Sequence, residues 1–579
     1  MCGIFGIASP EIDLNLAKES LHTLSHRGPD QSNSLQIKNV FIGHQRLSIL
    51  DLSESGMQPM HSNGVYITVN GEIYNFVEIR EELSCKYKFV SASDSEVVLH
   101  GYNEWGIEKL LSKIDGMYAI SIYDSNSEKI YLIRDRLGIK PLFYCSLNAT
   151  LSWASELKAI DKYFDGKLSI DNTALYDYLT YLYIPAPKTK FNEVKKLEPG
   201  NYLEFSTITG SQLIKTYWDL NPVENKNLSL EQAAKEIRRL VDKSVAEQMI
   251  SDVPVGFFLS GGVDSSSVVC SAKNNSNNIS TFSIGFKNTA SDETEYAEEV
   301  AKLFDTKHHV ALLSESDVVG MKQCFLDWYD EPFADTSAFP SFLVSRYAKN
   351  NVTVALTGDG GDEIFAGYHW YDIFMRIRHK KMSGSLPCLK KFLFPLYLSD
   401  NQIISRVANF VLRNYAYNDF ELHTKLLGGL LKEEKGMYAR KYGIECNYDD
   451  YWYFRKHYNC HLPLLSRLQY LDLKTYLPDD ILTKVDRVSM AVSLECRVPL
   501  LSKEIVEFSF TIPDSLKVKN GQLKYVLKTA YKDDLPDSVL YRKKKGFSIP
   551  VADWKSKLFP GYKTKQQAIL NWFETEGKL

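Results

Sequence analysis

Three features that would point to a membrane, secreted or nucleic-acid-coating protein are missing from this 579-residue sequence. No apolar run approaches the roughly 18 residues needed to cross a bilayer, and the nearest candidate, residues 392–398, contains Pro395. The N-terminus lacks the basic segment of a signal peptide and carries an acid from Glu11. The 68 Lys and Arg residues nearly balance the 72 Asp and Glu residues, which gives no support to nucleic-acid binding. We therefore expect a cytoplasmic protein without membrane insertion.

Cysteine is also sparse and irregular. The sequence has nine cysteines, which is an odd number, and they lie far apart without any Cys-x-x-Cys pair. This pattern argues against a disulfide framework and a zinc site. Most are expected to be small buried hydrophobes, with Cys2 as the exception. The 44% hydrophobic and 24% charged residues are ordinary globular values, so the chain can bury several cores in two to four domains.

The first ~200 residues are typical of an α+β domain. Short strand patterns occur at residues 65–69, 118–123 and 129–133, bounded by turns. Helical patterns at residues 75–83 and 95–105 lie between them. The arrangement predicts antiparallel sheets.

The pattern changes after a polar stretch at residues 221–227, where we place a domain boundary. A helical pattern at residues 230–249 is followed by apolar strand patterns at 255–259, 281–286 and 352–356. Helical patterns separate these strands, and that alternation predicts a parallel sheet covered by helices.

Cys2 could act as a nucleophile that supplies its own base. Removal of Met1 would give Cys2 a free α-amino group, and the usual pKa of such a group, about 7.7–8.0, lets it accept a proton from the neighbouring thiol. The alternative is a cysteine that lies near a terminus by chance.

Other segments supply what a bound α-amino acid needs. Asn70 and the backbone N–H of Gly71 could form an oxyanion hole. Arg46 could bind a carboxylate through two hydrogen bonds, while Glu72 and Asp94 could pair with an ammonium group. The alternatives are structural: an Asn-Gly turn, a surface ion pair of Arg46 and a helix N-cap at Asp94.

Four motifs, in their order and spacing, resemble the class II glutamine amidotransferase domain: residues 1–6 (MCGIFG), 26–30 (HRGPD), 44–49 (HQRLSI) and 70–75 (NGEIYN). The resemblance implies an α+β N-terminal-nucleophile (Ntn) fold of four layers, αββα. It implies that Cys2 attacks the glutamine amide and releases ammonia through a glutamyl thioester, with Asn70 and Gly71 as the oxyanion hole. It assigns glutamine binding to Arg46, Leu47, Ser48, Ile49, Leu50, Asn70, Gly71, Glu72 and Asp94.

Residues 260–266 (SGGVDSS) indicate a second site, because they follow an apolar strand and precede a helix that we expect to start near Ser267. Small residues let the backbone approach phosphate oxygens, and the helix N-terminus adds partial positive charge. The Asp264 carboxylate would repel a bound phosphate group unless a cation lay between the two, which suggests Mg²⁺. The loop is neither that of γ-phosphoryl transfer nor a dinucleotide-binding turn. The alternative is a generic strand-to-helix turn.

Two further segments concentrate charge. Residues 356–363 (LTGDGGDE) carry three glycines and three acids after a strand, which suits a metal and phosphate site; the alternative is a solvated acidic loop. Residues 542–547 (RKKKGF) could neutralise a developing pyrophosphate, and the alternative is solvated basic surface.

Together with residues 494–499 (LECRVP), these segments resemble the synthetase domain of glutamine-hydrolysing asparagine synthetases, and the resemblance covers about residues 2–550. It implies the N-type ATP pyrophosphatase fold, an adenine-nucleotide alpha-hydrolase-like α/β domain with a parallel sheet. In that family, ATP activates the β-carboxylate of aspartate as an acyl-adenylate with release of pyrophosphate. Ammonia from the first domain then gives asparagine and AMP.

The family motifs also assign roles to single residues. Asp264 and Asp362 would bind Mg²⁺, Asp359 stands at the acidic position tied to adenylate formation, and Lys544 would stabilise the pentavalent phosphorus. ATP binding falls to Leu259, Ser260, Gly261, Gly262, Asp264, Ser265, Ile284, Thr357 and Gly358. The predicted domains are residues 2–215 for the glutaminase, 230–555 for the synthetase and 556–579 for a C-terminal tail.

The chain departs from the family pattern in several places. Asp359 is one methylene shorter than the Glu of some members. The basic, aromatic, helical stretch at residues 370–470 matches no motif that can be interpreted. Only 29 residues follow Pro550, so we expect a helical cap to be missing. Residues 334–337 and 495–497 are the candidates for binding the acceptor aspartate.

The implied substrates are glutamine, ATP and aspartate, and the family's tendency to dimerise suggests a homodimer. An enclosed path between the domains is expected, because ammonia in water becomes ammonium, which is not nucleophilic.

One alternative function keeps both chemistries but amidates another carboxylate, such as a sugar uronate in polysaccharide biosynthesis. A second alternative, a glutaminase or a regulatory binding module, would predict a damaged pyrophosphate loop or a lost Cys2, and both are intact.

Overall fold

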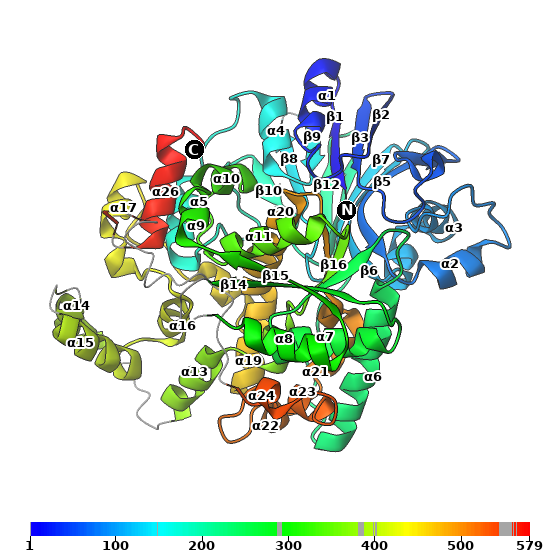
Figure 1. Cartoon of the computed structure of the whole chain (residues 1–579). Coiled ribbons are helices and arrows are strands. Elements are labelled where there is room, and N and C mark those ends of the chain that lie inside the picture. The colour runs from blue at the N-terminus through cyan, green and yellow to red at the C-terminus, as the bar shows by residue number, and fades with distance from the viewer. Residues whose placement is uncertain are drawn as a thin grey trace.

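The computed structural model describes residues 2–147, 149–286, 292–379, 387–397, 399, 402–542, 559, 561–562 and 564–579. Their strands form two antiparallel sheets of six strands each, followed along the chain by a parallel sheet of five strands. Figure 1 shows the N-terminal half in blue to cyan beside the parallel sheet in green. No helix within the described ranges is long and apolar enough to cross a membrane.

The first antiparallel sheet has the strand order β10-β8-β9-β1-β3-β2. Its central strand β1 pairs with β3 on one side and β9 on the other, and Gly3 lies opposite Gln45. Cys2 therefore immediately precedes a strand in the middle of the sheet. The strands are β1 (Gly3–Ala8), β2 (Gln31–Ile37), β3 (Val40–Arg46), β8 (Phe143–Leu147), β9 (Thr150–Ala154) and β10 (Val194–Lys196).

The second antiparallel sheet has the order β12-β11-β7-β6-β5-β4. Its strands are β4 (Met60–Ser62), β5 (Val65–Ile73), β6 (Gly116–Asp124), β7 (Lys129–Arg134), β11 (Asn201–Ser206) and β12 (Gln212–Thr216). β5 is longer than the predicted strand at residues 65–69, because the ladder with β6 continues through Asn70 and Gly71. The Asn-Gly turn considered above is therefore wrong: both residues lie within a strand.

The two antiparallel sheets form the middle of a four-layer sandwich. Ile4 of the first sheet and Ala119 and Leu132 of the second share one buried core between them. Helices α1 (Leu14–His22) and α4 (Leu157–Phe164) cover the first sheet, and α2 (Phe76–Leu83) and α3 (Glu96–Lys113) cover the second. The predicted αββα arrangement is confirmed.

The parallel sheet has the order β15-β14-β13-β16-β17, and all of its neighbours pair in parallel. This confirms the predicted α/β half. Its strands are β13 (Val255–Phe258), β14 (Ser280–Phe286), β15 (Lys307–Leu313), β16 (Val354–Leu356) and β17 (Glu495–Arg497), accompanied by helices α6 (Leu230–Gln248), α7 (Val263–Lys273), α8 (Thr294–Leu303), α11 (Ala338–Lys349) and α20 (Thr483–Met490).

Two helix starts position the second half. A capping box between Ser229 and Gln232 begins α6, fourteen residues after β12 ends at Thr216. The expected start of α7 near Ser267 is wrong, since the helix begins at Val263 with Gly262 as its N-cap. Asp264 and Ser265 consequently lie in the first turn of α7, where backbone N–H groups lack partners within the helix.

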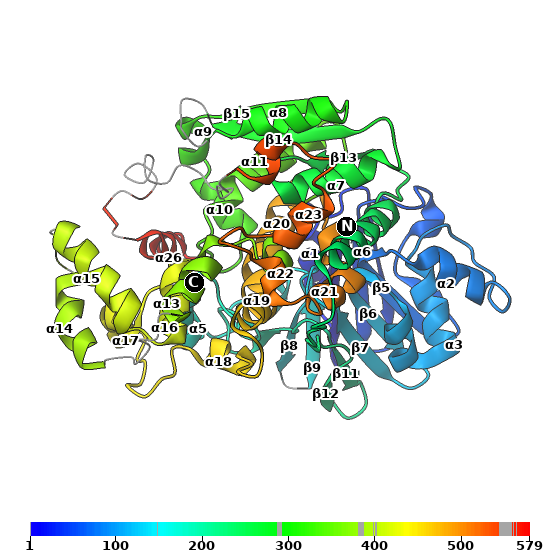
Figure 2. The same ribbon diagram turned by 90° about the horizontal axis from the view of Figure 1, so that it is seen from below.

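Residues 370–470 are largely helical, as expected, and Figures 1 and 2 show α14 and α15 projecting from the body of the molecule. The C-terminal α26 packs on α5, where the Tyr178 hydroxyl donates to the Gln566 carbonyl at 3.2 Å, so the short C-terminal segment still forms a helix. Further helices are α5 (Asn172–Tyr181), α9 (Glu315–Val319), α10 (Lys322–Trp328), α12 (Gly361–Phe365), α13 (His369–His379), α14 (Pro387–Tyr397), α15 (Gln402–Tyr415), α16 (Asp419–Leu427), α17 (Gly436–Lys441), α18 (Trp452–His457), α19 (Leu464–Lys474), α21 (Lys503–Ser509), α22 (Asp514–Lys517), α23 (Tyr525–Ala530), α24 (Asp537–Leu540) and α26 (Lys565–Thr575), with short turns η1 (Glu54–Gly56), η2 (Lys432–Glu434), η3 (Leu477–Leu482) and η4 (Pro499–Leu501).

Buried ion pairs join the two halves of the chain. The Arg27 guanidinium contacts both Asp486 oxygens, at 2.9 and 3.0 Å, and Glu156 Oε1 at 2.8 Å. Arg487 reaches the same Glu156 oxygen at 3.1 Å and also binds Asp330. All five side chains are at most 7% exposed, so their charges are compensated by one another rather than by water.

Substitution of Arg27 by alanine should destabilise the junction between the halves. It would leave Asp486 and Glu156 buried with less positive charge, a change that costs about 3–5 kcal/mol when one partner of a buried pair is removed. We expect a clearly lower melting temperature. Lys38→Ala is the control, because Lys38 and Glu128 form an exposed pair whose loss should leave the melting temperature near that of the parent chain. If the two variants had equal melting temperatures, the stability of the junction would not depend on Arg27.

Candidate active sites

Cys2 is held at the entrance to β1 by its backbone. Its N–H donates to Asn70 Oδ1 at 3.0 Å, and its carbonyl accepts from Arg27 Nε at 3.1 Å. The Sγ atom lies 4.0 Å from the Leu47 carbonyl. The residue is 7% exposed, and burial raises the pKa of the Cys2 thiol. A neighbouring base would therefore be needed to form the thiolate.

Asn70 and Gly71 lie on β5, the strand of the second sheet that faces β1. The Asn70 amide has a fixed orientation, because Oδ1 accepts from Cys2 and Nδ2 donates to Ser155 Oγ at 3.4 Å. Gly71 has φ +150°, and an added Cβ would stand 2.0 Å from the Met117 carbonyl oxygen. Only glycine fits there.

Arg46 sits at the end of β3 with its guanidinium buried among neutral oxygens. It donates to Gln31 Oε1 and the Ser53 carbonyl, both at 2.8 Å, and to the Leu50 carbonyl at 3.2 Å. The residue is 4% exposed. The surface ion pair considered from the sequence is thus wrong, and the positive charge is suited to a ligand's carboxylate.

Glu72 and Asp94 are two buried acids whose charges act on each other. Asp94 Oδ2 accepts from the backbone N–H of Ile73 at 2.6 Å, so Asp94 is tied to β5 instead of capping α3. Burial, with the charges of Glu495 and Asp94, raises the pKa of Glu72 well above its usual value. A ligand ammonium would relieve this repulsion.

Arg497 connects this group to the second half. From β17 it contacts Glu72 Oε2 at 3.3 Å and Glu495 Oε1 at 2.6 Å, and its Nη1 donates to the carbonyls of Gln248 and Ile250. Residues 495–497 were candidates for binding the acceptor aspartate. Instead, Arg497 lies against the candidate glutamine site, because β17 ends at the junction.

The loop after β13 is closed by its own small side chains. Ser265 Oγ accepts from the Ser260 N–H at 3.1 Å and donates to the Gly262 carbonyl at 3.2 Å. Gly261 has φ +67° and packs against α8. The loop after β16 approaches so closely that a Cβ on Gly358 would lie 2.7 Å from the Ser265 nitrogen. The two glycine-rich motifs, nearly 100 residues apart, therefore form one site.

The remaining predicted nucleotide-binding residues surround this loop pair. Leu259, directly after β13, and Ile284, within the neighbouring strand β14, are both buried, and the Leu259 N–H donates to the Phe282 carbonyl at 2.9 Å. Thr357 follows β16, and its hydroxyl donates to Asp359 Oδ2 at 2.8 Å. Lys544 lies outside the described residues.

Asp264 and Asp362 converge, as their assignment to one metal requires. Lys524 lies between them, binding Asp264 and approaching Asp362 Oδ1 at 2.5 Å. Burial opposes the charge on Lys524, but the two carboxylates raise its pKa to about 12. Two carboxylates fit Mg²⁺, which takes few protein ligands and completes its shell with phosphate and water. No cluster of three or more metal-ligating side chains occurs in the described part of the chain.

Sequence reasoning missed Lys524 and included Arg542 only as part of the basic run at residues 542–547. Lys524 belongs to no motif, and no signal separates it from other lysines. Arg542 Nε donates to the Gly261 carbonyl at 3.2 Å, and its guanidinium binds Glu293. Its place at the start of the basic run at residues 542–547 was a usable signal.

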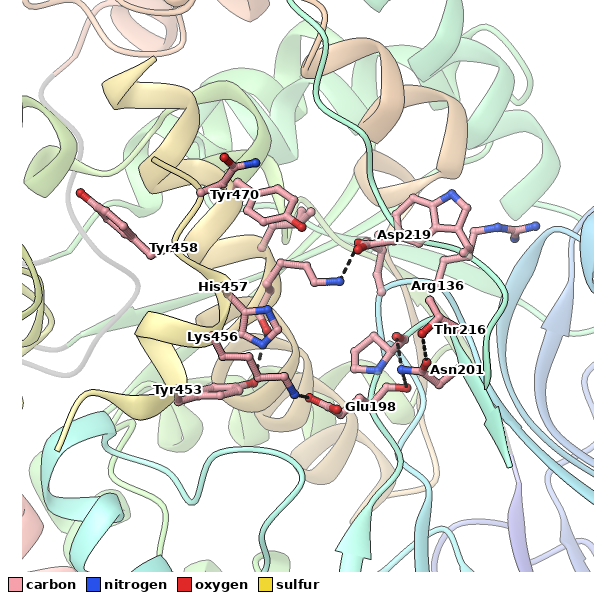
Figure 3. A pocket seen from close by; sticks show the side chains of 16 residues that line it. Arg136, Glu198, Asn201, Thr216, Asp219, Tyr453, Lys456, His457, Tyr458 and Tyr470 are labelled. Carbon is pink, nitrogen blue, oxygen red and sulfur yellow. Dashed lines mark hydrogen bonds and ion pairs between the residues drawn. The ribbon is translucent and has the colours of Figure 1, made fainter. Parts of the chain in front are cut away.

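A pocket of about 380 Å³ lies elsewhere, between the first half and helices α18 and α19 (Figure 3). Ion pairs of Lys456 with Glu198 and of Lys474 with Asp219 cross it. None of the predicted site residues lines it.

Comparisons with known proteins agree with this two-part arrangement. The glutamine amidotransferase domain family matches residues 1–218, and the asparagine synthase family matches residues 236–566. Asparagine synthetase [glutamine-hydrolyzing] 1 of Bacillus subtilis is 35% identical over 96% of this chain and 88% of its own length. A putative asparagine synthetase [glutamine-hydrolyzing] of Mycobacterium tuberculosis is 31% identical over the same shares. A glutamine phosphoribosylpyrophosphate amidotransferase structure from B. subtilis, 15% identical, covers 53% of this chain and 65% of that one with a TM-score of 0.31, too low to support an argument.

Gly71→Ala should destabilise the first half more than Gly106→Ala. Both glycines have positive φ, so both substitutions strain the backbone, but only the Gly71 site adds a collision, since nothing lies within 4 Å of a Cβ at Gly106. We expect a lower melting temperature for Gly71→Ala in differential scanning fluorimetry. Indistinguishable melting curves would mean that β5 relaxes around the new methyl group.

Proposed function

Since the chain belongs to the asparagine synthase family, we propose that it makes L-asparagine, L-glutamate, AMP and pyrophosphate from L-aspartate, L-glutamine, ATP and water. The supporting observation is the buried connection between two different candidate sites. Arg27 binds both the Cys2 carbonyl and Asp486, and Arg497 binds Glu72. An enzyme that passes ammonia from one site to another needs such a connection. The relatives' names give no support to a sugar uronate acceptor.

In the proposed glutaminase reaction, Cys2 Sγ attacks the side-chain amide of glutamine. After loss of Met1, the Cys2 α-amino group accepts the thiol proton and later delivers it to the leaving ammonia. The hydrogen bond from this nitrogen to Asn70 Oδ1 fixes the orientation of the Asn70 amide. Asn70 Nδ2, which donates to Ser155 Oγ in the structure, would stabilise the oxyanion together with the Gly71 N–H. Water then releases glutamate from the thioester.

Charge complementarity supports the proposed orientation of glutamine. The buried Arg46 guanidinium takes the α-carboxylate, and Glu72 and Asp94 take the α-ammonium. Backbone groups of Leu47, Ser48, Ile49 and Leu50, next to Arg46, complete this site.

In the proposed synthetase reaction, the β-carboxylate oxygen of aspartate attacks the α-phosphorus of ATP and pyrophosphate leaves. Ser260, Gly261, Gly262 and Ser265 hold the phosphates with backbone and hydroxyl donors, while Leu259, Ile284, Thr357 and Gly358 contact the adenosine. Mg²⁺ held by Asp264 and Asp362 would offset the phosphate charge, with Lys524 moving aside. Asp359 and Lys544 retain their proposed roles in adenylate formation.

Ammonia then attacks the acyl carbon, AMP leaves, and asparagine forms. The path proposed for ammonia runs through the junction, where buried side chains limit contact with water and hence the protonation of ammonia.

We further propose three domains, a homodimer and a cytoplasmic location. The domains comprise residues 2–215, 230–555 and 556–579. Eight described cysteines are free thiols, which suits a reducing compartment.

The first test incubates purified protein with ATP, Mg²⁺ and glutamine, with and without aspartate, and follows pyrophosphate and asparagine together. We expect aspartate to trigger both in equal amounts. Cys2→Ala should abolish the glutamine-dependent reaction and keep the ammonium-dependent one, because only the nucleophile is lost. Cys85→Ala, which removes an exposed cysteine, is the control and should keep both. Glutamine cleavage without aspartate-dependent pyrophosphate would refute asparagine synthesis.

Removal of divalent cations should separate the two reactions. With EDTA in place of Mg²⁺, aspartate-dependent pyrophosphate release should fall to background, since the phosphate charges lose their counterion. Glutamine hydrolysis should persist, because the Cys2 reaction uses no metal in this proposal. Asp264→Asn should raise the Mg²⁺ concentration needed for half-maximal activity. Unchanged metal dependence in this variant would remove Asp264 from the metal site.

A further inference from the structure

Asp335, Asp480 and Lys484 form a buried cluster of charged side chains, and the charge of Asp359 also acts on Lys484. Lys484 Nζ lies 3.1 Å from Asp335 Oδ2, and both side chains are largely buried. Asp480 is 1% exposed. Within the described part of the chain, neither oxygen of Asp480 has a hydrogen-bond donor. A buried carboxyl group without donors is costly unless a ligand completes it.

The cluster is assembled from three separate parts of the second half. Asp480 lies in η3, a π-helical turn, and Lys484 follows it on α20. Asp335 precedes α11 and accepts from the Ser337 N–H at 2.8 Å and its hydroxyl at 2.7 Å. These donors fix the Asp335 carboxylate where it meets Lys484, whereas the side-chain partner of the Asp480 carboxyl group is Asp335 itself.

Electrostatic coupling relates the cluster to the proposed adenylate site. Burial disfavours the charged form of Lys484, but Asp335, Asp359 and Asp480 together raise its pKa. Burial and the adjacent Asp335 raise the pKa of Asp480 well above its usual value. The charge of Asp359, in the loop after β16 that packs on Ser265, therefore acts on Lys484 together with the charges of the cluster.

A second buried group beside the cluster also lacks a partner. Tyr329 is 2% exposed, and its hydroxyl has no hydrogen-bond partner among the described residues. The charges of Asp335 and Asp480 both act on this hydroxyl. The Tyr329 hydroxyl and the Asp480 carboxyl group are thus two buried polar groups of one region that no described donor satisfies, as expected of a site that a polar ligand completes.

We infer that Asp480 and Asp335 bind the α-ammonium group of the acceptor amino acid and that Lys484 binds its α-carboxylate. Asp335 and Asp480 form a side-chain hydrogen bond, which needs a proton between two buried carboxyl groups, and an ammonium group bound there would replace that proton. Lys565, on α26, is the other cation whose charge acts on this pair. A ligand held this way directs its side-chain carboxylate toward Asp359. A sugar uronate has no ammonium to offer.

This inference rests on the proposed function, and the test compares two dicarboxylates. Aspartate and succinate share both carboxylates, but succinate lacks the ammonium. Pyrophosphate release is measured with ATP, Mg²⁺ and ammonium chloride, so the glutaminase site plays no part. We expect Asp480→Asn to raise the KM for aspartate at least about 30-fold while the KM for ATP changes little, because a buried charge partner is lost. The KM for succinate should change little, so the variant should lose the preference of the parent chain for aspartate over succinate.

Asp479→Asn is the matched control. Asp479 is also buried, but it accepts from the Ala186 N–H and the Tyr453 hydroxyl, both at 2.8 Å, and is not part of the cluster. Its substitution should keep the aspartate-to-succinate preference even if the protein is less stable. Asp480→Glu, which keeps the charge, should restore part of the preference. Glutamine hydrolysis by each variant reports whether the chain is folded.

The outcomes separate this inference from the proposed function. If the parent chain uses aspartate and Asp480→Asn keeps its preference over succinate, the ammonium subsite is refuted and asparagine synthesis stands. If Asp480→Asn is unfolded, Asp480→Glu and Lys484→Met are compared instead, and unchanged preference in both refutes the subsite. If the parent chain releases pyrophosphate with glucuronate and not with aspartate, both proposals are refuted.

Discussion

The contact on which both candidate sites depend is that of Arg27. Its buried guanidinium binds the Cys2 carbonyl, Glu156 of the first half and Asp486 of the second. The same side chain thus fixes the backbone of the candidate nucleophile and fastens the two halves together. Asp486 lies only two residues after Lys484 on α20, so the junction also sets the position of the helix that carries the proposed acceptor subsite.

Charges in this molecule fall into two groups with different partners. At the junction, Arg27, Arg487, Glu156, Asp486 and Asp330 compensate one another, as buried charges must. At the candidate sites, compensation is incomplete. Arg46 is surrounded by neutral oxygens, and Asp480 has no donor among the described residues. Such groups are held in place by the fold at a cost in stability, which ligand binding then offsets.

The architecture of the site follows from where strands end. β13 and β16 are parallel neighbours, so their carboxyl ends bring residues 260–265 and 357–362 together. β17, the next strand, ends in Arg497 at the junction and so extends the synthetase sheet toward Glu72. This explains why Arg497, in a segment of the synthetase motif, contacts Glu72 of the candidate glutamine site, and why we propose an acceptor subsite on α20 and before α11.

The two fold types and the order of the halves could be predicted from patterns along the chain, and most of the candidate residues from its resemblance to known families. Strand and helix periodicities, a cysteine at position 2 and two glycine-rich acidic loops are local features, and local features can be read from neighbouring residues. Other features became visible in the folded chain: Asn70 and Gly71 lie within β5, Lys524 stands between Asp264 and Asp362, and Arg497 contacts Glu72. Asp480 is likewise buried beside Asp335. These contacts join residues dozens to hundreds of positions apart, and their identity depends on which elements pack together, which no spacing along the chain encodes.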